Sequence, residues 1–90
     1  GNELIPIITH LNQNYPNPFN PTTTISFDVK ENETGNLSIF NMKGQLVFTR
    51  SFSAGYHNFL WEANSFSSGI YFYNLKTASY SHTRKMILLK

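Results

Sequence analysis

The feature that most limits how this chain can fold is a proline-rich run at residues 15–21, YPNPFNP. Each of its three prolines fixes the backbone φ angle and removes a backbone donor, so neither a helix nor a central strand can pass through the run. Asn14, Asn17 and Asn20 can hydrogen-bond nearby backbone groups in place of a ladder. The run therefore predicts a rigid, irregular strap, and we expect Tyr15 and Phe19 to anchor it by plugging one end of the core.

The rest of the chain follows the two-residue hydrophobic alternation of β-strands. Ile25, Phe27 and Val29 alternate with polar residues directly after the strap, which predicts a strand with one buried face. Turn residues recur about every eight to twelve positions, so the chain predicts an all-β antiparallel sandwich. Strands are expected over 22–29, 36–41, 45–52, 57–63, 69–76 and 82–90, with a further extended piece over 3–9.

Segment 45–52 returns from a tight turn centred on Lys43 and Gly44, where glycine adopts a positive φ without steric cost. Its apolar residues do not alternate cleanly, which predicts either a β-bulge or a strand with two buried faces. In the following strand, Phe59 and Trp61 share one face. A lone tryptophan in an alternating strand is typical of a core position, and the alternative is a sugar-stacking platform made with the tyrosines.

The charges are few and unevenly placed. With 90 residues and no cysteine, the chain is expected to form one domain without disulfides. The net charge is +2, and Lys76, Arg84, Lys85 and Lys90 lie within residues 76–90, where there is no acid. This pattern indicates either an edge strand protected by lysines or a docking tail for an acidic partner or a membrane surface.

The residue types that carry chemistry do not occur in useful groups. The five acidic residues form no visible pair for acid–base catalysis, and His10, His57 and His82 share no metal-ligand spacing. We therefore expect no enzyme activity, no metal and no cofactor. The small net charge argues against a nucleic-acid partner. No run of about eighteen apolar residues predicts a transmembrane segment, and no signal peptide opens the chain.

Five sequence segments together resemble the C-terminal sorting domain of type IX secretion cargo proteins, the type A or Por secretion tail family. The most specific are the proline strap and the final basic segment. The segments are, in order, LNQNYPNPFNPTTTISFDV, LSIFNMKGQLV, AGYHNFLWEA, SSGIYFYNLK and SHTRKMILLK. The resemblance covers residues 11–90. Two departures are a short link, WEANSFSSG, where many members have a longer loop, and Phe40 where tyrosine is common.

The resemblance implies an immunoglobulin-like sandwich of about seven strands that works as a folded secretion signal in a bacterium of the Bacteroidetes. Residues 1–10 would be the linker from an N-terminal passenger, in which Pro6 fits an extended segment better than a packed one, and residues 11–90 would be the sorting domain. A type IX outer-membrane shuttle or translocon would recognise the domain. A sortase-like peptidase would then cut within or before residues 1–10 and attach the passenger to a surface lipopolysaccharide. The implied route runs through the periplasm to the cell surface or the medium.

Candidate recognition residues lie in the strap, in the strand that begins at residue 69 and in the final segment. The final segment is expected to form an edge strand, which could close the sandwich, add a strand to a partner's sheet, or do both. The candidates are Tyr15, Pro16, Asn17, Pro18, Phe19, Asn20, Pro21, Gly69, Tyr71, Arg84, Lys85, Met86, Leu88 and Lys90.

Two alternative functions stay open at this point. One is a structural module of the fibronectin or flagellar-hook-cap kind, and the other is a carbohydrate-binding accessory module of a secreted hydrolase. A sugar-binding role requires aromatic side chains exposed in a row, whereas a sorting role predicts none. An exposed edge strand also leaves a strand-paired dimer open.

Overall fold

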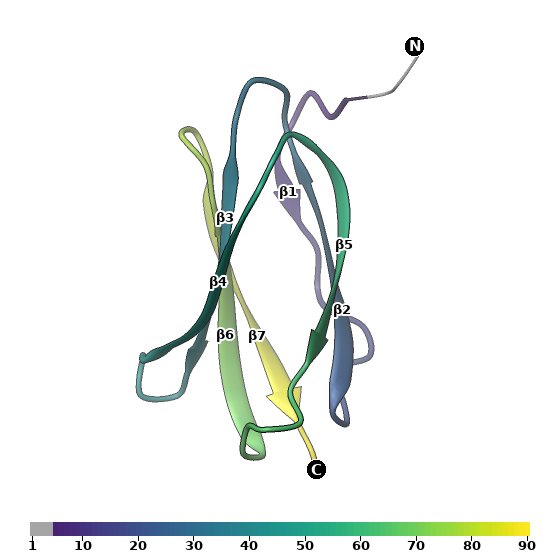
Figure 1. The fold of residues 1–90 in the computed structure, drawn as a ribbon, viewed down its shortest axis with the longest axis vertical. Coiled ribbons are helices and arrows are strands. Elements are labelled where there is room, and N and C mark those ends of the chain that lie inside the picture. The colour runs from purple at the N-terminus through teal and green to yellow at the C-terminus, as the bar shows by residue number, and fades with distance from the viewer. Residues whose placement is uncertain (1–4) are drawn as a thin grey trace.

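The computed structural model describes residues 5–90, which fold into two antiparallel β-sheets packed face to face (Figure 1). No helix occurs within this range. The strands are β1 (His10–Leu11), β2 (Thr22–Val29), β3 (Gly35–Asn41), β4 (Leu46–Phe52), β5 (Gly55–Glu62), β6 (Gly69–Lys76) and β7 (Ser81–Leu88). The predicted all-β sandwich of about seven strands is confirmed.

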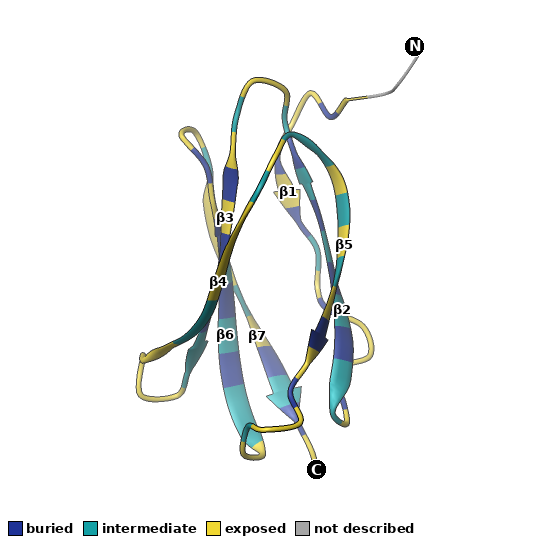
Figure 2. Cartoon of the chain, viewed as in Figure 1, coloured by how far each residue is buried: buried dark blue, intermediate teal, exposed yellow. Residues whose placement is uncertain are grey.

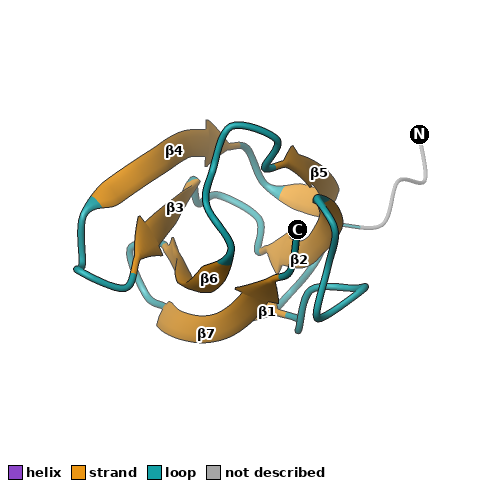
Figure 3. Ribbon diagram, turned by 90° about the horizontal axis from the view of Figure 1, so that it is seen from below, coloured by secondary structure: helices purple, strands orange, loops and turns teal. Residues whose placement is uncertain are grey.

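The two layers differ in width. One sheet has the strand order β1-β2-β5, and the other has the order β4-β3-β6-β7 (Figure 3). Strands β4 and β7 are therefore the two edges of the four-stranded sheet. The extended piece expected over 3–9 is not a strand in its described part, because the first strand begins at His10 and has two residues.

The inner faces of both sheets form the core, as the alternation predicts. Strand β2 buries every second residue, and so does most of β6 (Figure 2). Trp61 is only 4% exposed, which confirms its core position and contradicts a sugar platform built on it. The buried apolar residues are Leu11, Phe19, Ile25, Phe27, Val29, Leu37, Ile39, Trp61, Ala63, Tyr71, Tyr73, Leu75, Met86 and Leu88.

The hairpin between β3 and β4 has the predicted turn and bulge. Gly44 has a φ of 79°, and the Asn41 side-chain oxygen accepts hydrogen bonds from the backbone N–H groups of Lys43 and Gln45. The pairing shifts between Ile39 and Phe40, whose partners are Phe48 and Leu46, so Val47 is the extra residue. Val47 and Phe48 both pack against the core, and the bulge therefore keeps Leu46 on the outer face.

The described segment before β1 is packed at two of its residues, Pro6 and Thr9, whereas Ile5, Ile7 and Ile8 are exposed. Pro6 is buried, and its carbonyl accepts a hydrogen bond from the backbone N–H of Glu31. Thr9 is also buried, and its hydroxyl accepts one from the backbone N–H of Lys30. The prediction that Pro6 lies in an unpacked segment is wrong, because the β2–β3 loop supplies partners that are distant in sequence. The predicted linker also includes residues 1–4, which lie outside the described residues.

Candidate recognition site

In the structure the strap extends over residues 12–21, the whole segment between β1 and β2, and it runs along the outer edge of β7. The backbone N–H of Phe19 donates to the carbonyl of Ile87 (2.9 Å), and the backbone N–H of Leu89 donates to the carbonyl of Phe19 (2.9 Å). The side-chain oxygen of Asn17 accepts from the backbone N–H of Ile87 (3.0 Å). The Asn17 side chain therefore replaces one ladder bond that a proline-rich segment cannot provide.

These contacts correct the expectation that β7 offers its edge to a partner. The Gln13 side chain donates to the carbonyl of Lys85 (2.9 Å), so the strap occupies outward backbone groups of β7 from Lys85 to Leu89. An added strand has no open edge along this stretch. The terminal segment closes the sandwich, with the strap as its outer neighbour.

The two predicted anchors behave in opposite ways. Phe19 is 2% exposed, and its ring centroid lies 5.9 Å from that of Trp61. Tyr15 is 80% exposed, so the prediction that it plugs the core is wrong. Its backbone is fixed against Thr24 by two hydrogen bonds (3.0 and 2.9 Å), in a strand-like pairing that turns the neighbouring Asn14 inward. Because side chains alternate along extended backbone, the Tyr15 ring points to solvent.

Next to Tyr15 in sequence, the buried side chains of Asn14, Thr23 and Tyr73 form a hydrogen-bonded polar cluster, which we call the hub. The Tyr73 hydroxyl accepts from the backbone N–H of Asn14 (2.7 Å) and donates to the carbonyl of Asn12 (2.8 Å). The Asn14 side chain donates to the Thr23 hydroxyl (3.0 Å) and to the carbonyl of Pro16 (3.2 Å). Burial raises the pKa of Tyr73 to about 12, since the ionised form would lose its solvation. The neutral hydroxyl thus joins the strap to β6.

Two of the C-terminal cations are used inside the domain. The Arg84 guanidinium donates to the carbonyl of Leu11 (2.8 Å). The Lys90 ammonium donates to the carbonyls of Asn64 and Phe66, and its backbone N–H donates to the hydroxyl of Ser68 (2.9 Å). Lys90 thereby holds the β5–β6 loop in place.

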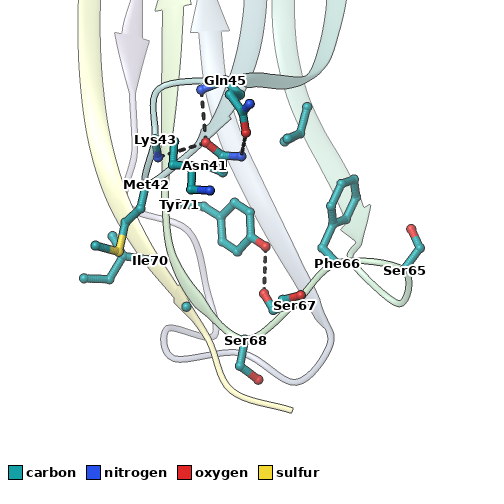
Figure 4. A pocket seen from close by; sticks show the side chains of 12 residues that line it. Asn41, Met42, Lys43, Gln45, Ser65, Phe66, Ser67, Ser68, Ile70 and Tyr71 are labelled. Carbon is teal, nitrogen blue, oxygen red and sulfur yellow. Dashed lines mark hydrogen bonds between the residues drawn. The ribbon is translucent and has the colours of Figure 1, made fainter.

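The β5–β6 loop borders an open cavity of about 450 Å³ at the lower end of the sandwich (Figure 4). The cavity lies between the β3–β4 turn and the β5–β6 loop, and its walls include Lys43, Phe66 and Tyr71. The Tyr71 hydroxyl donates to the carbonyl of Ser67 (2.7 Å), which fixes the loop from within.

The structure divides the predicted recognition residues by their surroundings. Phe19, Tyr71, Met86 and Leu88 are core residues, while Asn17, Arg84 and Lys90 hold other segments in place. Gly69 pairs with Leu88 at the start of β6 and has a φ of 150°. Pro21 is partly exposed, and the candidates that point to solvent are Tyr15, Pro16, Pro18, Asn20 and Lys85. The structure thus brings the strap and β7 together, and Asn17 and Lys90 also stay exposed although they hold other segments in place.

Sequence reasoning found one of the tethering residues and missed three. Asn14 was predicted to bond nearby backbone groups, and its side chain donates to the carbonyl of Pro16. Thr23, Tyr73 and Tyr80 were not predicted to hold the strap or β1; the Tyr80 hydroxyl accepts from the backbone N–H of Leu11 (3.1 Å). The available signal was a polar group at a core position, because buried tyrosine and threonine hydroxyls need partners.

Within residues 5–90, His, Asp and Glu side chains form no group of three or more that could hold a metal ion. Across the same range, no helix is long and apolar enough to cross a membrane.

Together the sandwich, its closed β7 edge and its solvent-facing strap define a small all-β module. The sequence model of the secretion system C-terminal sorting domain matches residues 13–89, and the chain therefore belongs to this family of type IX secretion signals. No curated protein matches the chain. A sorting domain marks an exported protein for the type IX system and is not itself catalytic.

Proposed function

We propose that this domain carries an N-terminal passenger from the periplasm across the outer membrane, and that a type IX shuttle or translocon recognises the folded domain at its strap. A sortase-like peptidase then removes the domain and attaches the passenger to surface lipopolysaccharide, or the passenger is released into the medium. Residues 1–10 are proposed as the linker and residues 11–90 as the sorting domain.

The observation that carries the recognition step is the geometry of the strap. The backbone of Tyr15 is held by two hydrogen bonds to Thr24, yet the residue is 80% exposed. A side chain presented from a fixed backbone loses little conformational entropy on binding. Pro16, Pro18 and Asn20 share this exposure, so the strap offers a preorganised surface rather than a flexible tail.

The packing of the N-terminal segment refines the proposed cut. Because Pro6 and Thr9 pack onto the β2–β3 loop, a peptidase would reach the chain on the N-terminal side of Pro6 while the domain stays folded. Mass spectrometry of the mature passenger tests this. A passenger that ends beyond Asn14 would contradict it.

The sorting proposal is tested by a transplant. The full chain is fused behind a fluorescent passenger that bears an ordinary export signal, in a cell with a type IX apparatus and in a matched strain that lacks it. We expect the passenger on the surface or in the medium only when the apparatus is present. Retention of a folded fusion in the periplasm of both strains overturns the proposal and favours the structural or sugar-binding alternatives.

Recognition at the strap is tested in the same fusion with Tyr15→Ser. Because the Tyr15 ring makes no core contact, we expect the variant to keep its melting temperature but to reach the surface about tenfold less efficiently, a loss typical of an aromatic hot spot. The matched control is Tyr56→Ser, which removes a ring of 60% exposure from β5. Equal export of both variants would contradict recognition at the strap.

Deletion of the terminal segment is not a useful test of docking. Removing residues 85–90 also removes Met86 and Leu88, which are fully buried in the core. The deletion would unfold the domain whether or not the segment contacts a partner, so single exposed positions have to be changed instead.

A further inference from the structure

The outer face of the four-stranded sheet is divided into two unlike halves. The half toward the β6–β7 turn is polar, and its side chains hydrogen-bond across the strands as expected for a solvent-facing sheet. These cross-strand bonds join Ser51 to Asn36 (2.6 Å), Ser38 to Thr49 (3.1 Å) and Asn74 to Thr83 (3.0 Å).

The half toward the C-terminus is apolar. Phe40 lies across from Leu46 on one side and from Phe72 on the other, and Ile70 lies across from Ile87. Continuing the β3–β6 register by one position places Met42 beside Ile70, and Figure 4 draws both on the side of β6 opposite the Tyr71 ring. We call this surface the outer apolar patch; it consists of Phe40, Met42, Leu46, Ile70, Phe72 and Ile87.

The outer apolar patch does not belong to the core. The partly buried side chains that pack against the core are Val47, Phe48, Phe52, Phe59, Phe66 and Tyr80, and no patch residue is among them. Met42 is 68% exposed and Leu46 is 55% exposed. Outward-facing residues of a sandwich are ordinarily polar, and contiguous exposed apolar side chains mark interaction sites.

Charge indicates which partner fits this surface. The strands of the four-stranded sheet carry no acid, and the cations on their outer face are Lys76 and Lys85, which pair with Asn36 and Phe72. The acids on strands, Asp28 and Glu62, lie in the other sheet. Exposed Lys85 is paired with Phe72 at the margin of the patch, and exposed Lys43 follows Met42. The complementary surface therefore has an apolar centre and carboxylates around it.

The same charges argue against two other occupants. A second copy of this chain would place lysines against lysines, which is unfavourable. A lipid surface is bound by apolar side chains that penetrate the headgroup region by about 5–10 Å. Phe40, Ile70, Phe72 and Ile87 are instead half-buried between neighbouring strands, so they form a shallow surface suited to a protein.

We infer that the outer apolar patch docks onto an apolar, carboxylate-rimmed surface of a protein in the secretion apparatus. This inference rests on the proposed sorting function and adds a second contact face to it. The patch adjoins the strap, because Ile87 bonds the strap through its backbone and contributes its side chain to the patch.

The test uses the passenger fusion described above with two kinds of variant. Leu46→Thr combined with Phe72→Thr removes apolar surface with residues that favour strands, and Lys85→Glu reverses the charge at the margin. Leu60→Thr is the matched control, because Leu60 is also 55% exposed but lies on strand β5 of the other sheet. Lys85→Arg is the control that keeps the positive charge.

We expect the patch variant and Lys85→Glu to reach the surface about tenfold less than the wild type, while both controls stay within about twofold. Melting temperatures of the purified chains confirm that the variants are folded. If the double variant is unfolded, Leu46→Thr alone and Lys85→Glu carry the test, since both change exposed side chains.

Each other outcome overturns the inference. Wild-type export by folded patch variants shows that the patch only stabilises the sheet. A wild-type fusion that stays in the periplasm overturns the sorting function and the inference with it. If the chain binds vesicles of phosphatidylcholine and phosphatidylglycerol and Phe72→Thr abolishes this binding, the patch is a lipid-binding surface. If the chain forms a dimer in sedimentation equilibrium and Phe72→Thr abolishes the dimer, the patch binds a second copy.

Discussion

The two edges of the four-stranded sheet are protected in different ways. At β7 the strap bonds the backbone directly, and the neighbouring side chains of Phe19, Met86 and Leu88 are almost fully buried. At β4 no strand of the described chain pairs with the outer edge, and no side chain of this strand is fully buried. A proline-rich segment can therefore complete a core where an ordinary strand would otherwise have to lie.

The β4 edge has a different kind of protection. Arg50 is paired with the buried Leu37, so its side chain leaves the strand on the inner face. Its guanidinium lies 5.0 Å from the centroid of the Phe52 ring and 5.9 Å from that of Phe59. An inward-pointing charge on an edge strand discourages pairing with another chain, because an added strand would bury that charge. One edge is thus closed by contacts and the other by an electrostatic cost.

The largest difference between the edges is expected from phenylalanine truncation. Phe19→Ala should lower the free energy of unfolding by about 3–5 kcal/mol, because it leaves a cavity under the strap. Phe48→Ala, on β4, should cost about 1–2 kcal/mol, since its ring is already partly exposed. Urea unfolding followed by circular dichroism measures both. Equal losses would show that the strap edge is no more tightly packed than the β4 edge.

A smaller effect is expected from the hub that holds the strap. Tyr73→Phe leaves the N–H of Asn14 and the carbonyl of Asn12 without the hydroxyl, and should cost about 1–3 kcal/mol at pH 7. In the wild type, the raised pKa of Tyr73 means that the unfolded chain loses this proton at lower pH than the folded chain. The stability from neutral Tyr73 is therefore complete below pH 10 and is lost as the pH rises through about 12.

The pH dependence separates this cause from a general loss of packing. We expect the stability difference between wild type and Tyr73→Phe to shrink between pH 10 and pH 12, as measured by urea unfolding at several pH values. Tyr56→Phe, which alters an exposed ring on β5, serves as the matched control and should leave the wild-type curve unchanged. A difference that stays constant with pH would contradict ionisation of Tyr73 as the cause.

Substitution of Arg50 at the β4 edge is expected to change the stability least, and to change the association of the chain instead. Arg50→Thr should alter the unfolding free energy by about 1 kcal/mol or less, the usual size of an exposed cation–π contact. It should promote concentration-dependent self-association, because the edge then lacks its charge. Sedimentation velocity over a range of concentrations measures this, with Arg50→Lys as the charge-preserving control. A variant that stays monomeric would show that Arg50 does not guard the edge.

Much of the fold could be predicted because its causes are local. The alternation of Ile25, Phe27 and Val29 specifies a strand with one buried face, and the three prolines of the strap exclude regular structure whatever surrounds them. The bulge opposite Ile39 was visible as a break in that alternation. The motifs that resembled the sorting-domain family were likewise contiguous in sequence, and the family match confirms them.

The surroundings of the predicted recognition residues could not be read from the sequence, because these residues contact partners at long sequence separations. Tyr15 and Phe19 are aromatic residues of one strap, and only their pairings, Tyr15 with Thr24 and Phe19 with Leu88, decide that the first ring faces solvent and the second faces the core. Arg84 was predicted as a residue that a partner recognises, but it binds a carbonyl 73 positions away in sequence.

The sequence by itself determined the local backbone: where strands run, where turns fall, and that residues 15–21 must be irregular. Only the tertiary structure decided which edge the strap covers, which charges remain free, and that apolar residues of β3, β4, β6 and β7 share one outer face. The physical reason is that φ restrictions and side-chain alternation act between neighbours along the chain. Partners for backbone groups, charges and apolar surface are instead set by strand order and register, which bring distant segments together.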